Sequence, residues 1–142
     1  MSETDAPVGL ATRSTGVTTT APSSADRPSS ARRTLRVVHA LDSFGVGGTE
    51  LNLVRTLERI DRERFDLALV TLTADGPLRA RFDATGVPII AFELRNMYGP
   101  AAWRTGWRLA RWLRATGTDV VHCHDAYSNI FTAFWARVAG IR

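Results

Sequence analysis

Four apolar runs rich in β-forming residues alternate with segments of helical periodicity, and this alternation constrains the fold more than any other feature of the chain. The β-forming runs cover residues 35–40, 65–72, 87–92 and 119–124. Parallel strands need a long crossover connection, usually a helix, so a repeated β-α order builds a parallel sheet with helices on both faces. The sequence therefore predicts an α/β, doubly wound (Rossmann-like) fold.

The segments between the β-forming runs predict four helices. They cover about 51–60, a short stretch around 78–82 that Gly86 closes, 101–115 and 126–139. Thr49 or Gly48 is expected to cap the first helix, and Pro77 suits the first position of the second. Pro88 indicates an edge position for the third strand. In the last helix the residues expected on the buried side are Ile130, Phe131, Phe134 and Val138.

The composition indicates that the 142 residues comprise a tail and one domain. Residues 1–33 are rich in Ser, Thr, Ala and Pro and contain no aromatic residue, so we expect a disordered tail. Residues 34–142 can hold a core, and no apolar run there is long enough to span a membrane. A single cysteine, Cys123, indicates a reducing compartment and a cytoplasmic protein.

A glycine-rich turn, Ser43-Phe44-Gly45-Val46-Gly47-Gly48-Thr49-Glu50, joins the first strand to the first helix. Such a turn lets the backbone approach a phosphate, and the N–H groups of the first helical turn favour an anion. Glu50 stands where a dinucleotide fingerprint needs its third glycine, which disfavours a nicotinamide dehydrogenase. The chain contains no lysine, which excludes a P-loop NTPase.

A second motif, His122-Cys123-His124-Asp125, ends the fourth strand. Ligands of doubly wound folds bind beyond the carboxyl ends of the strands, where the strand order reverses. With the strand order 3-2-1-4 the first and fourth strands are neighbours, so we expect the two motifs to meet at one site.

Residues 35–41, the turn Gly47-Gly48-Thr49-Glu50 and the strand Asp119-Val120-Val121-His122-Cys123-His124 resemble the N-terminal domain of retaining GT-B glycosyltransferases of family 4. The resemblance covers residues 34–142. It implies transfer of a sugar from a nucleotide-sugar donor with retention, without a metal, in glycan, polysaccharide or glycolipid synthesis. By the same resemblance Gly47 and Gly48 approach the donor diphosphate, and His124 faces the donor sugar near the reacting centre.

The resemblance also implies a C-terminal domain that carries the nucleotide-base pocket, and this chain does not contain it. We therefore expect a fragment or truncated product that ends after the fourth strand and its helix and is inactive alone. Variable N-domain loops read the acceptor in this family, which here indicates the loop 95–99, with Asn96 and Tyr98, and the stretch around Phe44. A substrate role for Glu50 rests on the resemblance, since a first-turn carboxylate is also favoured by the helix dipole.

The histidines and the neighbouring aspartate each have a structural interpretation beside the functional one. His122 and His124 share one face of their strand, but no third metal ligand is evident nearby, so no metal site or cofactor is expected. His39 lies on the adjacent strand and could be a neighbour of these histidines across the sheet, but core packing is its expected role. Cys123 is expected to be a small buried residue, and Asp125 either to contact substrate or to cap the last helix.

The helix at 101–115 carries tryptophans and arginines side by side. An apolar face is formed around Leu109 and Leu113, with a basic stripe beside it. Such a helix either lies on an anionic membrane surface or presents a solvated arginine face, and both interpretations stay open. The residues expected at a membrane are Trp103, Arg104, Trp107, Arg108, Arg111 and Trp112. The alternative function is a non-catalytic Rossmann-like module that binds a nucleotide or a partner; nucleic acid is not expected.

Overall fold

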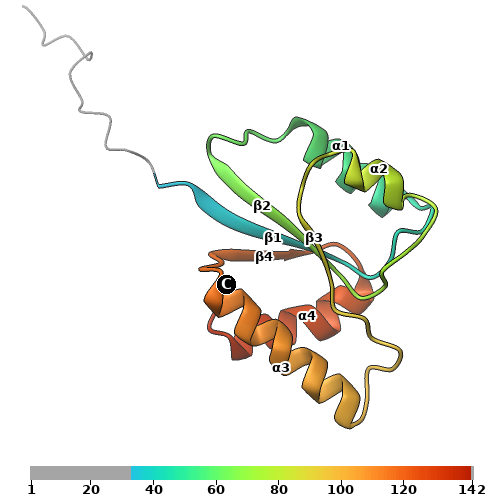
Figure 1. The fold of residues 1–142 in the computed structure, drawn as a ribbon, viewed down its shortest axis with the longest axis vertical. Helices are drawn as coiled ribbons and strands as arrows, with labels where there is room; N and C mark the ends of the chain where they lie inside the picture. Colours follow the sequence, from blue (N-terminus) through green and yellow to red (C-terminus); the bar gives the residue numbers. More distant parts are fainter. Residues whose placement is uncertain (1–32, 142) are drawn as a thin grey trace, which may run out of the picture. The chain divides into compact units, whose positions relative to one another are not determined.

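The computed structural model describes residues 33–141, and the statements below concern that range. The predicted tail, residues 1–33, lies outside the described residues except for Arg33. The described elements, shown in Figure 1, are β1 (Leu35–Leu41), α1 (Gly48–Arg59), β2 (Phe65–Thr71), α2 (Arg79–Asp83), β3 (Ile89–Ala91), α3 (Pro100–Ala115), β4 (Val120–Cys123) and α4 (Ala126–Val138).

The strands form one parallel sheet in the order β3-β2-β1-β4. The predicted α/β fold and strand order are confirmed. β3 lies at one edge of this sheet, as Pro88 indicated, and β4 lies at the other. Strands β1 and β4 pair directly, with Val37 opposite Val120 and His39 opposite His122.

Helices α1 and α2 cover one face of the sheet, and α3 and α4 cover the other (Figure 1). We call these the α1 face and the α3 face. Side chains alternate between them along each strand: Val38 and Val70 pack toward α3 and α4, whereas Leu41 and Leu69 pack toward α1 and α2. The described helices leave β4 uncovered on the α1 face, where Val120 and His122 are exposed.

Two predicted helix starts are wrong. The residue that caps α1 is Gly47, with extended backbone, rather than Gly48 or Thr49, and no side chain accepts a hydrogen bond from the first turn. Leu78 caps α2, so Pro77 precedes that helix instead of opening it. The glycine turn is therefore one or two residues shorter than expected, and α1 begins with backbone N–H groups that no side-chain cap satisfies.

The predicted buried side of α4 is also wrong in part. Phe131 is buried as expected, but Ile130 and Phe134 are 61% and 52% exposed. Trp135 takes the buried position and packs over Gly106 of α3, where an added Cβ would overlap its indole ring. Because a glycine there leaves room for an indole, α4 is turned so that Trp135, not Phe134, packs against α3.

Candidate functional site

The carboxyl ends of β1 and β4 lie side by side, which brings together the two motifs that the sequence singles out. The backbone N–H of His124 donates to Ala40 O at 3.0 Å. Just beyond the two strands, the N–H of Asp42 donates to Asp125 Oδ2 at 2.8 Å. The start of the glycine loop is thus fixed against the start of α4, at the reversal of strand order where doubly wound folds bind ligands.

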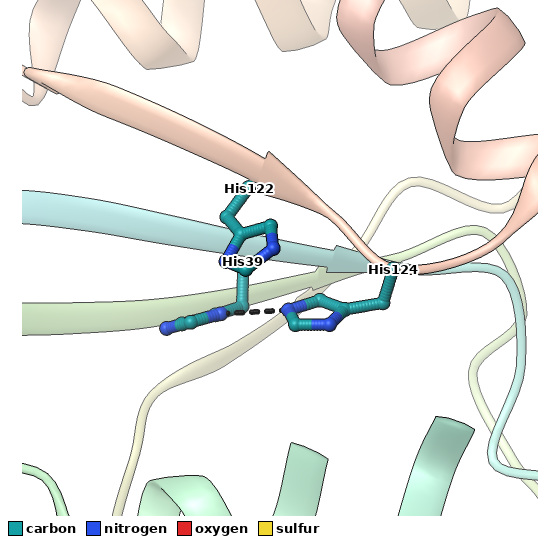
Figure 2. A group of neighbouring side chains, drawn as sticks. All are labelled: His39, His122 and His124. Carbon is teal, nitrogen blue, oxygen red and sulfur yellow. Dashed lines mark hydrogen bonds between the residues drawn. The ribbon is translucent and has the colours of Figure 1, made fainter. Parts of the chain in front are cut away.

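All three histidines of the chain gather at this point. Figure 2 shows their side chains projecting from the same face of the sheet, and His39 Nδ1 and His124 Nε2 form a hydrogen bond of 2.8 Å. The ring of His122 lies 4.2 Å from that of His124 and 5.5 Å from that of His39, measured between centroids. His39 is buried, as predicted, but it is a polar partner of His124 rather than a packing residue alone.

A sequence signal supports the possible cross-sheet position of His39 over core packing alone. Residues 37–42 read Val-Val-His-Ala-Leu-Asp, and residues 120–125 read Val-Val-His-Cys-His-Asp. The parallel register pairs these segments position by position from Val37 with Val120 through Ala40 with Cys123. Aligning the two strand ends on their aspartates would have placed His39 beside His122 and within reach of His124.

Both partners of the histidine pair are neutral at pH 7. Burial, then the neighbouring His124 and His122, lowers the pKa of His39 to about 4. Burial and His122 also lower the pKa of His124 to about 4, against the opposing effect of Asp125. A neutral imidazole offers one N–H donor and one acceptor, so the shared hydrogen bond contains one proton.

The remaining nitrogen of His39 indicates which ring holds that proton. His39 Nε2 is buried and has no hydrogen-bond partner within the described residues. A buried donor without an acceptor is the rarer defect in proteins, so we assign the proton to His39 Nδ1 and leave Nε2 unprotonated. His124 then accepts at Nε2 and carries its own proton on Nδ1, where it can donate to a ligand.

Asp125 is occupied by structural hydrogen bonds. Its Oδ1 accepts from the N–H of Ser128 at 2.8 Å, which caps α4. Its Oδ2 accepts from Asp42 N–H at 2.8 Å and from the Ser128 hydroxyl at 3.0 Å. The capping interpretation is confirmed, and both carboxylate oxygens are already engaged in holding the site together.

The glycine turn is compact, and its residues differ in accessibility. Phe44 is fully buried between α1 and α2, so a substrate contact through that side chain does not fit the structure. Glu50 folds back over the turn, and a Cβ added at Gly47 would overlap its carboxylate. A Cβ at Gly48 would meet nothing within 4 Å. Open space therefore lies against Gly48, at the first residue of α1.

The loop after β3 lines a cavity of about 370 Å³ at the same end of the sheet. Asn96 and Tyr98 lie on its wall. Asp42, just after β1, and Tyr127, in the first turn of α4, also line it. Asn96 Oδ1 accepts from the N–H of Tyr98 at 3.1 Å, which shapes the loop. The two predicted acceptor-loop residues thus share a cavity with the strand ends.

A second hollow, of about 230 Å³, lies between α3 and α4 and adjoins the first, because Met97 and Tyr98 line both. Its other walls are apolar, with Trp103, Ile130 and Phe134 among them.

The predicted membrane-contact residues of α3 are mostly exposed. Trp103 and Trp107 are 64% and 54% exposed, and Arg104, Arg108 and Arg111 are exposed beside them. No described helix is long and apolar enough to cross a bilayer.

Trp112 does not belong to this exposed surface. It is half-buried, packs against the core of the α3 face and meets Phe92 edge-on at 5.9 Å between ring centroids. The prediction that placed Trp112 with the other tryptophans at a membrane does not fit the structure. We use the name aromatic surface for the exposed patch formed by four aromatic residues and one isoleucine: Tyr98, Trp103, Trp107, Phe134 and Ile130.

The sheet order and the helices on both faces define a Rossmann-like α/β domain, with polar side chains at the carboxyl ends of β1 and β4. Residues 47–142, which include the glycine pair and His124, match the family model described as "Glycosyl transferase 4-like domain". The chain belongs to that family of glycosyltransferases. The resemblance to the N-terminal domain of family 4 GT-B enzymes is therefore confirmed.

Two solved structures are similar in fold. The crystal structure of Acinetobacter baumannii MurG has a TM-score of 0.59 and 15% identity over 77% of this chain and 33% of that chain. The apo form of the lipopolysaccharide outer core galactosyltransferase WaaB has a TM-score of 0.54 and 14% identity over 76% of this chain and 31% of that one. The chain spans about a third of the length of either. No curated protein sequence matches significantly.

Proposed function

We propose that the chain is the acceptor-side domain of an enzyme that transfers a sugar from a nucleotide-sugar to an acceptor with retention at the anomeric carbon. The observation that carries the proposal is that the strand end bearing His124 and the start of the glycine loop are tied together, through the hydrogen bond from Asp42 N–H to Asp125 Oδ2, in a chain of the glycosyl transferase 4-like family. The nucleotide-base pocket is assigned to a further domain, and transfer takes place between the two.

On the donor side, Gly48 and the first turn of α1 receive the diphosphate. Gly47 supplies no side-chain cap, and Gly48 leaves the backbone open. The free N–H groups of the turn and the positive end of the helix dipole favour the anion, so no metal is required to bind it. Glu50 lies over this turn, so its carboxylate must swing aside or accept a hydrogen bond from a hydroxyl group of the substrate.

His124 acts on the sugar as a neutral hydrogen-bond donor. His39 Nδ1–H holds its Nε2, which fixes the ring and leaves Nδ1–H for the donor sugar. A pKa near 4 means that His124 does not carry a positive charge at neutral pH. Its contribution is therefore a preorganised dipole beside the reacting centre rather than a proton given to the leaving group.

The acceptor is proposed to be amphipathic, with a polar sugar end and a lipid. The cavity at the strand ends is lined by Asp42, Arg95 and Asn96, and suits the polar end. The apolar hollow between α3 and α4 adjoins it through Met97 and Tyr98 and suits the start of a hydrocarbon chain. Exposed arginines beside Trp103 and Trp107 then favour peripheral contact with an anionic membrane face.

The test uses the full-length protein with a panel of nucleotide-sugars and a lipid-linked sugar acceptor. His124→Ala is expected to lower kcat by about 10²–10³-fold, because one preorganised donor is lost. Cys123→Ala is the matched control, since that neighbouring side chain lies on the opposite face of β4, and it should retain activity. Proton NMR of the product should show the anomeric configuration of the donor. Wild-type rates in His124→Ala would overturn the role of His124, and no transfer with any donor would favour the non-catalytic module instead.

A further inference from the structure

The three histidines form a cluster that the proposed transfer does not use in full. Each of His39, His122 and His124 offers one ring nitrogen, and these nitrogens all lie within 4.8 Å of one another. The chain has no other histidine. His122 takes no part in the His39–His124 hydrogen bond, and nothing in the proposed mechanism calls for it.

We propose that His39, His122 and His124 bind one divalent transition-metal cation of the zinc class through their imidazole nitrogens. The strand register sets up the site, since His39 pairs with His122 and His124 follows on the same face. A second observation is that His39 Nδ1 and His124 Nε2 already lie 2.8 Å apart at a side chain only 3% exposed, so two ligand nitrogens converge in a buried position. Imidazole suits zinc, copper and nickel, whereas magnesium and manganese prefer oxygen ligands.

The geometry needs a small adjustment to receive the ion. In a tetrahedral zinc site with bonds of about 2.0–2.1 Å, neighbouring ligand nitrogens stand about 3.3 Å apart. His39 Nδ1 and His124 Nε2, now 2.8 Å apart, would separate slightly if both bind the ion, and the proton of His39 would move from Nδ1 to Nε2. His122 is exposed and its ring can turn toward the other two. Three protein ligands leave a fourth position open to water or to a substrate oxygen.

Cys123 is not part of this site. Its side chain lies on the opposite face of β4, and burial raises the pKa of its thiol to about 11. Asp125 is next in sequence, but its carboxylate already accepts hydrogen bonds from Asp42 and Ser128. The ligand set is therefore three imidazoles.

The consequence for activity rests on the proposed function, because it requires His124 to face the donor sugar. An ion on the cluster would draw the His124 ring away from its hydrogen bond with His39 and occupy the space of the sugar. The ion is then an inhibitor of transfer and not a cofactor for it. Micromolar zinc would slow the enzyme, and a chelator would restore the rate.

The experiment uses untagged full-length protein, titrated with Zn²⁺ by calorimetry and with Co²⁺ by visible absorption. One ion per chain and a tetrahedral Co²⁺ spectrum are expected, with no binding of Mg²⁺. Loss of an outer-sphere partner alone weakens metal sites roughly 10–100-fold, so His122→Asn should weaken Zn²⁺ binding by about a hundredfold or more. Because His122 is exposed, that variant should fold as the parent does, and Cys123→Ala should bind as the parent does.

The outcomes separate the two proposals. Absence of Zn²⁺ binding, or parental affinity in both His122→Asn and His124→Asn, overturns the metal site and leaves the transferase proposal standing. If one Zn²⁺ binds through the histidines but sugar transfer continues at the uninhibited rate, the metal site is supported and the placement of His124 at the donor sugar is overturned.

Discussion

The two faces of the sheet present opposite chemistry at the same end of the molecule. On the α1 face, polar groups meet at the strand ends: three histidines and an open glycine turn. On the α3 face, the packed core continues outward into the aromatic surface, with arginines beside it. The comparison teaches that one parallel sheet can carry a polar site on one face and an apolar hollow on the other, which the proposed function assigns to the donor and to the acceptor.

The faces also differ in where their glycines lie. On the α3 face, Trp135 occupies the space left by Gly106. The α1 face has open backbone at Gly48 and an exposed His122. Changes on the α3 face should therefore affect stability most, and changes at the strand ends of the α1 face should affect activity most.

The largest effect on stability is expected from Gly106→Ala. The new methyl group would overlap the indole of Trp135, and overpacking of this kind costs about 1–3 kcal/mol. Chemical denaturation, monitored by tryptophan fluorescence, should show the lower midpoint. Adding Trp135→Leu to Gly106→Ala should recover part of the loss. Equal stability of Gly106→Ala and the parent would mean that α3 and α4 are not packed as described.

The histidine cluster makes the α1 face sensitive to acid. The pKa values of His39 and His124 are near 4 in the folded chain and near 6.5 when unfolded, so between these values the unfolded state binds more protons. Stability should therefore fall as the pH falls from 6.5 to 4, with a slope of up to about 1.4 kcal/mol per pH unit for one fully displaced proton.

Thermal unfolding in the presence of a chelator, at steps of half a pH unit, measures that slope. His39→Gln removes the buried imidazole and should flatten the profile, even if it lowers stability throughout. A parent profile that is flat from pH 6.5 to 4 would contradict the burial of an unprotonated His39.

The aromatic surface is expected to contribute to membrane contact. Trp103→Ser combined with Trp107→Ser should weaken binding to anionic vesicles about tenfold, since the loss of about 1.4 kcal/mol of interfacial burial corresponds to that factor. Co-sedimentation at low salt measures it. Val46, 72% exposed in the glycine turn, supplies the control, and Val46→Ser should not change binding. If the parent ignores anionic vesicles, the membrane contact is absent.

Much of this architecture follows from sequence, because parallel strands need helical crossovers and β-branched runs mark the strands. The prediction of the buried side of α4 is wrong in part. Periodicity cannot identify that side, because four neighbouring residues are all apolar: Ile130, Phe131, Phe134 and Trp135. The choice is made by Gly106, which lies far away in sequence. The site was predicted at His124 and at the glycine pair, but the role of His39 depends on a strand register that only the paired Val-Val-His segments indicate.

The smallest effect on stability is expected at Gly48, where an added Cβ meets nothing within 4 Å. Gly48→Ala should change the free energy of unfolding by less than about 0.5 kcal/mol. If the donor diphosphate lies against this backbone, Gly48→Ala should raise the KM for the nucleotide-sugar, and the bulkier Gly48→Val should abolish transfer while the fold persists. Gly106→Ala should behave in the opposite way to Gly48→Ala. It should be less stable than the parent, but below its unfolding temperature its KM for the nucleotide-sugar should be unchanged. An unchanged KM in Gly48→Val would move the donor away from the glycine turn and leave the α1 face with the histidines alone.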